Sequence, residues 1–207
     1  ADREIFARVR LPERPLDSLT DFLPGLDVNR TDGSVRGEVE VRGLRDALKV
    51  TGLAEARAKE IAWQGFATAL RDFKLDTSFN GESVAISGSA IGSDGGSLSI
   101  EDAGLKLDNL SEAFSSTFDT LLGNQLYGSL KLNDFKMVYQ DPKEGPMSAT
   151  LGGNLSLDGT VRTPEISGQL LISEVNAAPP STLAPAGAPR QFPIDPRFNV
   201  SMLATDS

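Results

Sequence analysis

The stretch that decides the fold spans residues 153–172 and reads GNLSLDGTVRTPEISGQLLI. Apolar residues alternate in it with small or charged residues, as Leu155 and Leu157 show. Successive side chains of a β-strand point to opposite faces, so this alternation predicts strands with one aliphatic and one polar face. The break at residues 163–164, a threonine and a proline, predicts that two such strands meet there.

The same alternation recurs along the chain, with the degenerate unit Gly-x-(Leu/Val)-x-(Leu/Val/Ile) at irregular spacing. Its clearest copies lie at residues 33–43, 84–88, 96–100 and 128–132. Strand-like pattern is already present at residues 5–11 and is still present at residues 198–202. Repetition of this kind favours an elongated stack in which each strand contacts its neighbours. We therefore interpret residues 1–207 as a fragment of one elongated β-repeat domain.

The alternation changes phase at two places. Leu132 is the last of an even-numbered apolar series that continues on odd numbers at Phe135, and Ile100 gives way in the same manner to Ala103. A β-bulge inside a single strand produces such a shift and also bends the sheet. A turn between two short strands produces it equally well, and the alternation alone does not distinguish them.

Helical signals are few. Residues 108–123 carry apolar residues at helical spacing, with Asn109 as a cap and Gly123 as a stop, and predict a short helix. Residues 53–63 favour a helix by propensity, but their apolar positions form no single helical stripe, so a strand stays open. Residues 177–196 are rich in proline, alanine and glycine, which predicts a surface loop or linker within the domain.

Composition agrees with these patterns: 39% of the residues are hydrophobic and 6% are aromatic, with 20 glycines and 12 prolines. Many short strands joined by turns suit this profile better than a helical bundle does. The predicted fold is all-β, an elongated curved antiparallel sheet of the β-taco or β-groove kind with at most one or two short helices.

Charge and missing residue types exclude several classes of function. The net charge of -9 disfavours a nucleic-acid partner, because phosphate backbones repel an acidic surface. The chain has neither cysteine nor histidine, which removes the Ser-His and Cys-His nucleophile pairs and the usual zinc ligands. The acidic groups Asp94, Glu101 and Asp102, and Asp141 with Glu144, are expected at solvated turns or polar strand faces. We expect no enzymatic activity, no metal and no cofactor.

The aliphatic face is the candidate functional site. Its expected members are Val39, Val41, Val84, Ile86, Leu98, Ile100, Leu130, Leu132, Leu155, Leu157, Val161, Ile166, Leu170 and Ile172. In a β-sandwich these side chains would meet the inner face of a second sheet. In a sheet that curls into an open trough they would line the trough instead. Both arrangements place the same residues inside, so the alternation does not choose between them.

The quoted stretch also resembles the repeat of a known family. Its pattern Leu-x-Leu-x-Gly-Thr-Val-x-x-Pro-x-Ile-x-Gly-x-Leu-x-Ile over residues 155–172, the proline-rich break and the segment at residues 195–200 resemble the repeat of the TamB family. These proteins are inner-membrane-anchored components of the translocation and assembly module of diderm bacteria, related to AsmA-like proteins. The match covers the last quarter of the chain, and residues 33–43 and 95–107 are compatible with it.

The resemblance implies a periplasmic β-taco around a hydrophobic groove, with the full-length protein anchored in the inner membrane and touching membranes through parts outside this chain. It implies conduction or shielding of phospholipid acyl chains between the two membranes, which are held because each buried CH2 contributes about 0.8 kcal/mol. One alternative is a chaperone that assembles outer-membrane β-barrel partners by β-augmentation. Another is a structural or adhesive β-repeat surface protein. The family implies no catalytic residues.

Overall fold

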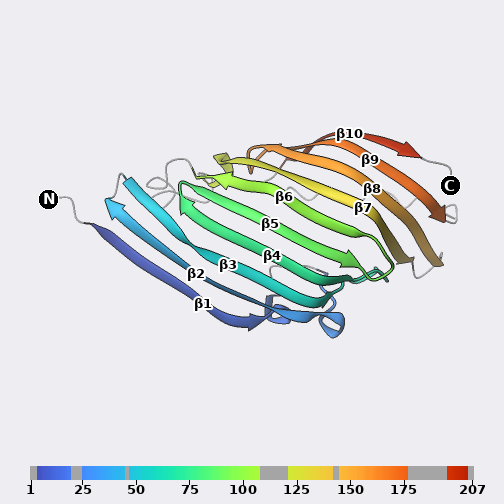
Figure 1. Ribbon diagram of the computed structural model, residues 1–207, viewed down its shortest axis with the longest axis horizontal. Helices are drawn as coiled ribbons and strands as arrows, with labels where there is room; N and C mark the ends of the chain where they lie inside the picture. The colour runs from blue at the N-terminus through green and yellow to red at the C-terminus, as the bar shows by residue number, and fades with distance from the viewer. Residues whose placement is uncertain are drawn as a thin grey trace.

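The computed structural model describes residues 4–19, 25–44, 47–107, 121–141, 145–176 and 195–204. Its strands form one unclosed ten-stranded sheet in the order β1 to β10 (Figure 1). The strands are β1 (Ile5–Pro15), β2 (Asp32–Leu44), β3 (Ala47–Ile61), β4 (Leu70–Gly81), β5 (Ser83–Gly92), β6 (Ser97–Lys106), β7 (Gln125–Asp141), β8 (Gly145–Gly159), β9 (Pro164–Asn176) and β10 (Arg197–Ala204). Short 3-10 helices lie at η1 (Leu16–Leu19), η2 (Val28–Arg30) and η3 (Leu121–Gly123).

Strands that are consecutive in the chain are neighbours in the sheet, as the alternating repeat predicted. The pairs from β1–β2 to β8–β9 are antiparallel. The last pair differs from the fully antiparallel sheet that was expected, because β10 runs parallel to β9. A parallel pair needs a long connection that returns the chain to the starting end of the sheet, and residues 177–196 provide that length. The sheet is therefore mixed.

Local propensity is overruled in β3, where residues 53–61 extend as a strand despite their helix-favouring composition. Ala54 and Ala58 lie opposite Gly37 and Gly33 of β2, so each alanine methyl group faces a residue without a side chain. The helix expected over residues 108–123 falls outside the described residues except for η3. The proline-rich segment also lies outside them up to residue 194, and it connects β9 to β10.

Both predicted phase shifts are β-bulges inside continuous strands. Asp102 in β6 has a φ of 47° and Asp134 in β7 has a φ of 44°, and the pairing register shifts at each. Two bulges that the sequence did not signal occur at Asp72 in β4 and Glu174 in β9, with φ of 49° and 50°. A short polar side chain such as aspartate tolerates the left-handed region better than most side chains. The bulges keep apolar residues on one face along strands that bend.

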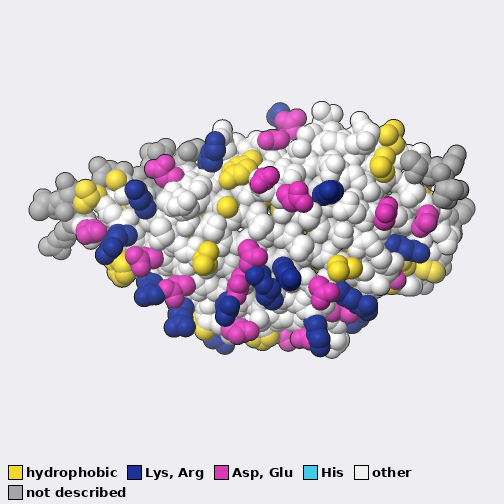
Figure 2. All heavy atoms as spheres, viewed as in Figure 1, with side chains coloured by type: hydrophobic (Ala, Val, Ile, Leu, Met, Phe, Trp, Pro, Cys, Tyr) yellow, Lys and Arg dark blue, Asp and Glu magenta, His cyan; other side chains and the backbone are white. Residues whose placement is uncertain are grey.

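Paired residues share a face, so the registers sort the side chains into two sets. One row starts at Ile100 and continues through Leu130, Leu155, Gly168 and Val200, from β6 to β10. We name the face that carries this row the apolar face. The opposite side is the charged face, which the viewer sees in Figure 2 with acidic and basic side chains interleaved over β1 to β4.

The buried core lies on the apolar face in two clusters. The first contains Val41, Leu48, Val50, Val84 and Leu107. The second contains Leu16, Leu26, Ala56, Ala58 and Ile61, with partly buried residues such as Trp63 and Phe73 packed against it. Leu16 and Leu26 belong to the β1–β2 connection and Leu107 follows β6, so connections rather than a second sheet complete these clusters.

The β3–β4 connection, residues 62–69, forms a strap between early and late strands. The Ala67 amide donates to the Val138 carbonyl at 2.8 Å and the Gln140 amide to the Gly65 carbonyl at 2.7 Å, both on β7. The strap passes the β5–β6 turn at residues 93–96, where the Ser93 amide donates to the Ala69 carbonyl at 2.8 Å. Because β5 and β6 are shorter than β4 and β7, the strap fills the space beyond their turn.

Candidate functional site

The structure places all the expected site residues except Val161 on the apolar face. Register pairs link them across the sheet, for example Val39 opposite Val9 and Leu157 opposite Ile166. Val161 lies in the β8–β9 connection instead, and its amide donates to the Asn124 carbonyl at 3.0 Å. Its strand-like neighbours suggested a longer strand, but β8 ends at residue 159 and the chain turns there.

Four of the expected residues lie in what we call the filled half, over β2 to β5. Val41 and Val84 are buried in the first cluster, and Val39 and Ile86 pack against it. Leu107 closes this cluster from the connection after β6. These side chains are therefore occupied by contacts within the molecule, which is the arrangement of an ordinary core.

The remaining strand residues form what we call the open half, over β6 to β10. Its members are Leu98, Ile100, Leu130, Leu132, Leu155, Leu157, Ile166, Leu170 and Ile172, and each is only partly buried. All strands among the described residues belong to this one sheet, so none of them packs over the open half. Aliphatic side chains of five strands thus form a continuous surface that is partly accessible to solvent.

The apolar face is most exposed at the two edges of the sheet. Val9 on β1 is 66% exposed, and Phe198 and Met202 on β10 are 69% and 68% exposed. Among the described strands, β1 and β10 each have a neighbour on one side only, so their side chains lack half of the lateral contacts of a central strand. Large apolar side chains at such exposure are typical of surfaces that meet another molecule.

Ion pairs cross β1 to β4 on the charged face. Nε of Arg8 donates to Oε1 of Glu38 at 2.8 Å, and Arg36 pairs with Glu55 on the next two strands. The hydrogen bond that Arg8 donates to Glu38, and then the negative charge of Glu38, raise the pKa of Arg8 above its usual value. Ion pairs as exposed as these contribute little to stability, but they keep this face of the sheet hydrated.

A groove of about 660 Å³ crosses β1 to β6 on the charged face. Its floor is the backbone of a cross-strand row whose side chains lie on the apolar face: Leu11, Gly37, Ala54, Thr77, Ile86 and Ala103. Its walls are the side chains of the residues flanking that row, such as Glu38 and Glu55. The apolar-face residues two positions from the floor, such as Val35 and Val39, do not line it. The groove therefore opens between rows of polar side chains, and the sequence did not predict it. Its walls also include Leu53, which is 68% exposed, so apolar and charged side chains line the groove together.

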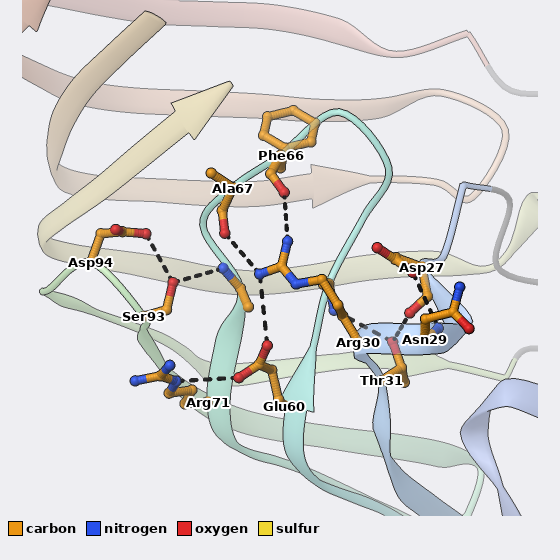
Figure 3. A network of polar contacts seen from close by, with 12 residues as sticks. Asp27, Asn29, Arg30, Thr31, Glu60, Phe66, Ala67, Arg71, Ser93 and Asp94 are labelled. Atoms are coloured by element: carbon orange, nitrogen blue, oxygen red, sulfur yellow. Dashed lines mark hydrogen bonds and ion pairs between the residues drawn. The ribbon is translucent and has the colours of Figure 1, made fainter. Parts of the chain in front are cut away.

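A polar network anchors the strap (Figure 3). The Arg30 guanidinium donates to the Phe66 carbonyl at 3.2 Å and to the Ala67 carbonyl at 2.9 Å. Glu60 lies 3.7 Å from the same guanidinium and 3.4 Å from Nε of Arg71. The network satisfies strap carbonyls that have no strand partner in the β3–β4 connection, so its role is structural.

The described carboxylates that were expected at turns or polar strand faces have local partners or local structural roles. Asp94 accepts from Oγ of Ser93 at 2.8 Å, and Glu101 accepts from Oγ of Ser99 at 3.0 Å. Asp102 forms a bulge, and the side chains of the pair at residues 141 and 144 lie outside the described part of the chain. Within that part, no group of three or more acidic residues is placed to hold a metal ion.

None of the described residues forms a helix long and apolar enough to cross a membrane. No family model, no curated protein and no solved structure matches this chain. The likeness to the TamB repeat therefore rests on the residues quoted for it in the sequence.

Proposed function

We propose that the open half of the apolar face binds phospholipid acyl chains and conducts or shields them between the inner and outer membranes. The observation that carries this proposal is the row from Ile100 to Val200, in which five strands present apolar residues or glycine on a surface that no described strand covers. A surface lined in this manner offers a chain of methylene groups contacts along its whole length.

The free energy of burial is large enough to hold an acyl chain on this surface and even enough along it to let the chain slide. Burial of each CH2 contributes about 0.8 kcal/mol, so an acyl chain of a dozen carbons is held by several kcal/mol after ordering costs. The lining residues Leu130, Leu155 and Ile166 are all aliphatic, and no charged side chain interrupts their rows in the registers. The free energy of a bound chain then changes little from one row to the next, which favours sliding.

The proposed location is the bacterial periplasm, with the full-length protein anchored in the inner membrane. This part of the proposal rests on the resemblance of residues 153–172 to the TamB repeat.

The test compares two adjacent positions of β8. A photoreactive amino acid at Leu157, on the apolar face, should crosslink to lipid when the protein is isolated from bacterial envelopes. The same amino acid at Ser156, on the charged face, should not, and this pair controls for unspecific labelling. Equal lipid labelling at both positions, or none at either, would count against the proposal. Mass spectrometry of the isolated chain should also detect co-purified phospholipid.

A second function is suggested by the outer strands β1 and β10, each of which pairs with a single neighbour among the described strands. Unfolded strands of outer-membrane β-barrel proteins could add to β1 or β10 by β-augmentation, which uses backbone groups rather than the apolar wall. A proline in an edge strand should then abolish the activity and leave the lipid crosslink at Leu157 intact. A chain that co-purifies with neither lipid nor client strands would instead match a structural β-repeat protein.

A further inference from the structure

The filled half and the open half of the apolar face meet at strand β5. On the filled side, Leu107 packs in one cluster with Val41 and Val84, and its amide donates to the Glu82 carbonyl of the β4–β5 turn at 2.7 Å. Leu107 is only 8% exposed, so this connection adds an apolar layer to the strand side chains. No described strand adds such a layer over the open half.

Position 88 shows how one apolar row ends at this boundary. Gly88 of β5 lies between Leu75 of β4 and Ile100 of β6, in the row that continues to Leu130. A Cβ added to Gly88 would lie 3.1 Å from Cδ1 of Leu75 and 3.7 Å from Cδ1 of Ile100. These two side chains therefore fill the space above the glycine, and the row is closed there by the protein itself.

The other apolar-face positions of β5 are covered as well. Ile86 packs against the first cluster, and Ala90 is 2% exposed. The ring of Phe135 covers the end of the strand, because a Cβ added to Gly92 would lie 3.1 Å from its Cε2 atom. We name residues 84, 86, 88, 90 and 92, together with the side chains that cover them, the β5 stop.

The β5 stop limits where an acyl chain can lie. A chain on the open half can continue past β5 only if it displaces side chains that are already packed, which is unfavourable in a well-filled interior. A methyl group that rests against the stop contacts the sheet below it and the stop beside it, so it buries more apolar surface than it would farther out. A charged head group gains nothing there, because the covered positions are valine, isoleucine, alanine and glycine.

We propose that β5 is the end stop of the acyl-binding surface. Lipid on this chain lies with the methyl ends of its acyl chains toward β5 and with its head group toward β8 and β9. The open half then holds and shields the chains and does not pass them along the sheet to β2, β3 and β4. This inference rests on the proposed function and specifies how lipid lies on that surface.

The test uses the full chain and phosphatidylethanolamine vesicles that contain one of two photoreactive forms of the same lipid. One form carries a diazirine at the terminal carbon of an acyl chain, and the other carries it next to the glycerol ester. Mass spectrometry identifies the labelled residues. The chain-end probe should label β6, and the ester-side probe should label β8 and β9. Neither probe should label Val39 or Phe79, which pack against the first cluster.

The outcomes separate this inference from the proposed function. If the chain-end probe labels the filled half as strongly as the open half, β5 is not a stop, although lipid binding stands. If both probes give the same pattern, the orientation is wrong. If neither probe labels the open half, the proposed function fails and the stop fails with it.

Removal of a covering side chain should move the boundary. Leu75→Ala empties one side of the space above Gly88, so the chain-end probe should now label β4 and β5 in that row. Ile100→Ala empties the other side and provides a second variant. Leu132→Ala removes the same atoms from the open half and should leave the boundary at β6. Thermal unfolding verifies that each variant is folded, and labelling that stays at β6 in both Leu75→Ala and Ile100→Ala would overturn the stop.

Discussion

Gly153 lies directly opposite Leu170 in the β8–β9 pair, with a φ of 128°, and a Cβ added to it would come within 2.1 Å of the Gln169 carbonyl oxygen. The neighbouring Gly152 has ordinary backbone angles, and a Cβ added there would have Leu171 at 3.8 Å as its nearest contact. The backbone therefore requires glycine at position 153, whereas position 152 has room for a larger residue.

Substitution of these glycines should separate the two situations. Gly153→Ala forces both a disfavoured φ and a clash with backbone, and should lower the free energy of unfolding by about 2–4 kcal/mol. Gly152→Ala should change it by less than about 0.5 kcal/mol. Urea denaturation of both variants provides the measurement. Similar stability of the two would show that β8 and β9 do not approach each other as described.

The bulge at Asp134 should be sensitive to the shape of the residue rather than to its charge. Asp134→Gly removes the steric cost of the left-handed φ and should leave stability unchanged or raise it by up to about 1 kcal/mol. Asp134→Val introduces a β-branched side chain at the same φ and should lower stability by at least about 1 kcal/mol. Thermal unfolding compares them, and a more stable valine variant would argue for a regular strand at this point.

Arg30 should control whether the strap stays in place. Arg30→Met removes the donors to the Phe66 and Ala67 carbonyls and should cost about 1–3 kcal/mol. Amide exchange of Gln140, which donates to the strap, should become faster in this variant. Lys131→Met is the matched control, because it removes an exposed charge from the charged face of β7. It should change neither the free energy of unfolding nor the amide exchange of Gln140.

Shortening a leucine to alanine should lower the free energy of unfolding more in the filled half of the apolar face than in the open half. Leu48→Ala empties a position in the first cluster and should cost about 2–4 kcal/mol, whereas Leu155→Ala in the open half should cost about 1 kcal/mol. Chemical denaturation in detergent-free buffer measures both. Equal costs would indicate that the open half is packed as tightly as the core.

The sequence was most informative where strand geometry is local. Alternation placed Leu155 and Leu157 on one face, and the phase shifts located the bulges near Asp102 and Asp134, because side-chain direction follows directly from the two-residue period. The composition of residues 53–63 left helix and strand open, and pairing with β2 and β4 makes residues 53–61 a strand.

Features that depend on distant pairing were not predictable. Nothing in the local pattern shows that Phe66 contacts Tyr139, at 5.4 Å between ring centroids, or that β10 is parallel to β9. The same limit applies to the candidate site. Val41 and Leu155 both lie in stretches where apolar and polar residues alternate. Val41 is nevertheless buried, because Leu107, which follows β6, packs in the same cluster.

The strap has a consequence for how the sheet forms and fails. An array in which each strand contacts only its neighbours can gain or lose strands one at a time from either end. The bonds from Ala67 and Gly65 to β7 tie the third and fourth strands to the seventh, so the strands between them are enclosed in a single cooperative unit. During synthesis that unit becomes complete only when β7 has emerged, and a chain truncated after β6 should be degraded quickly by proteases that spare the longer one.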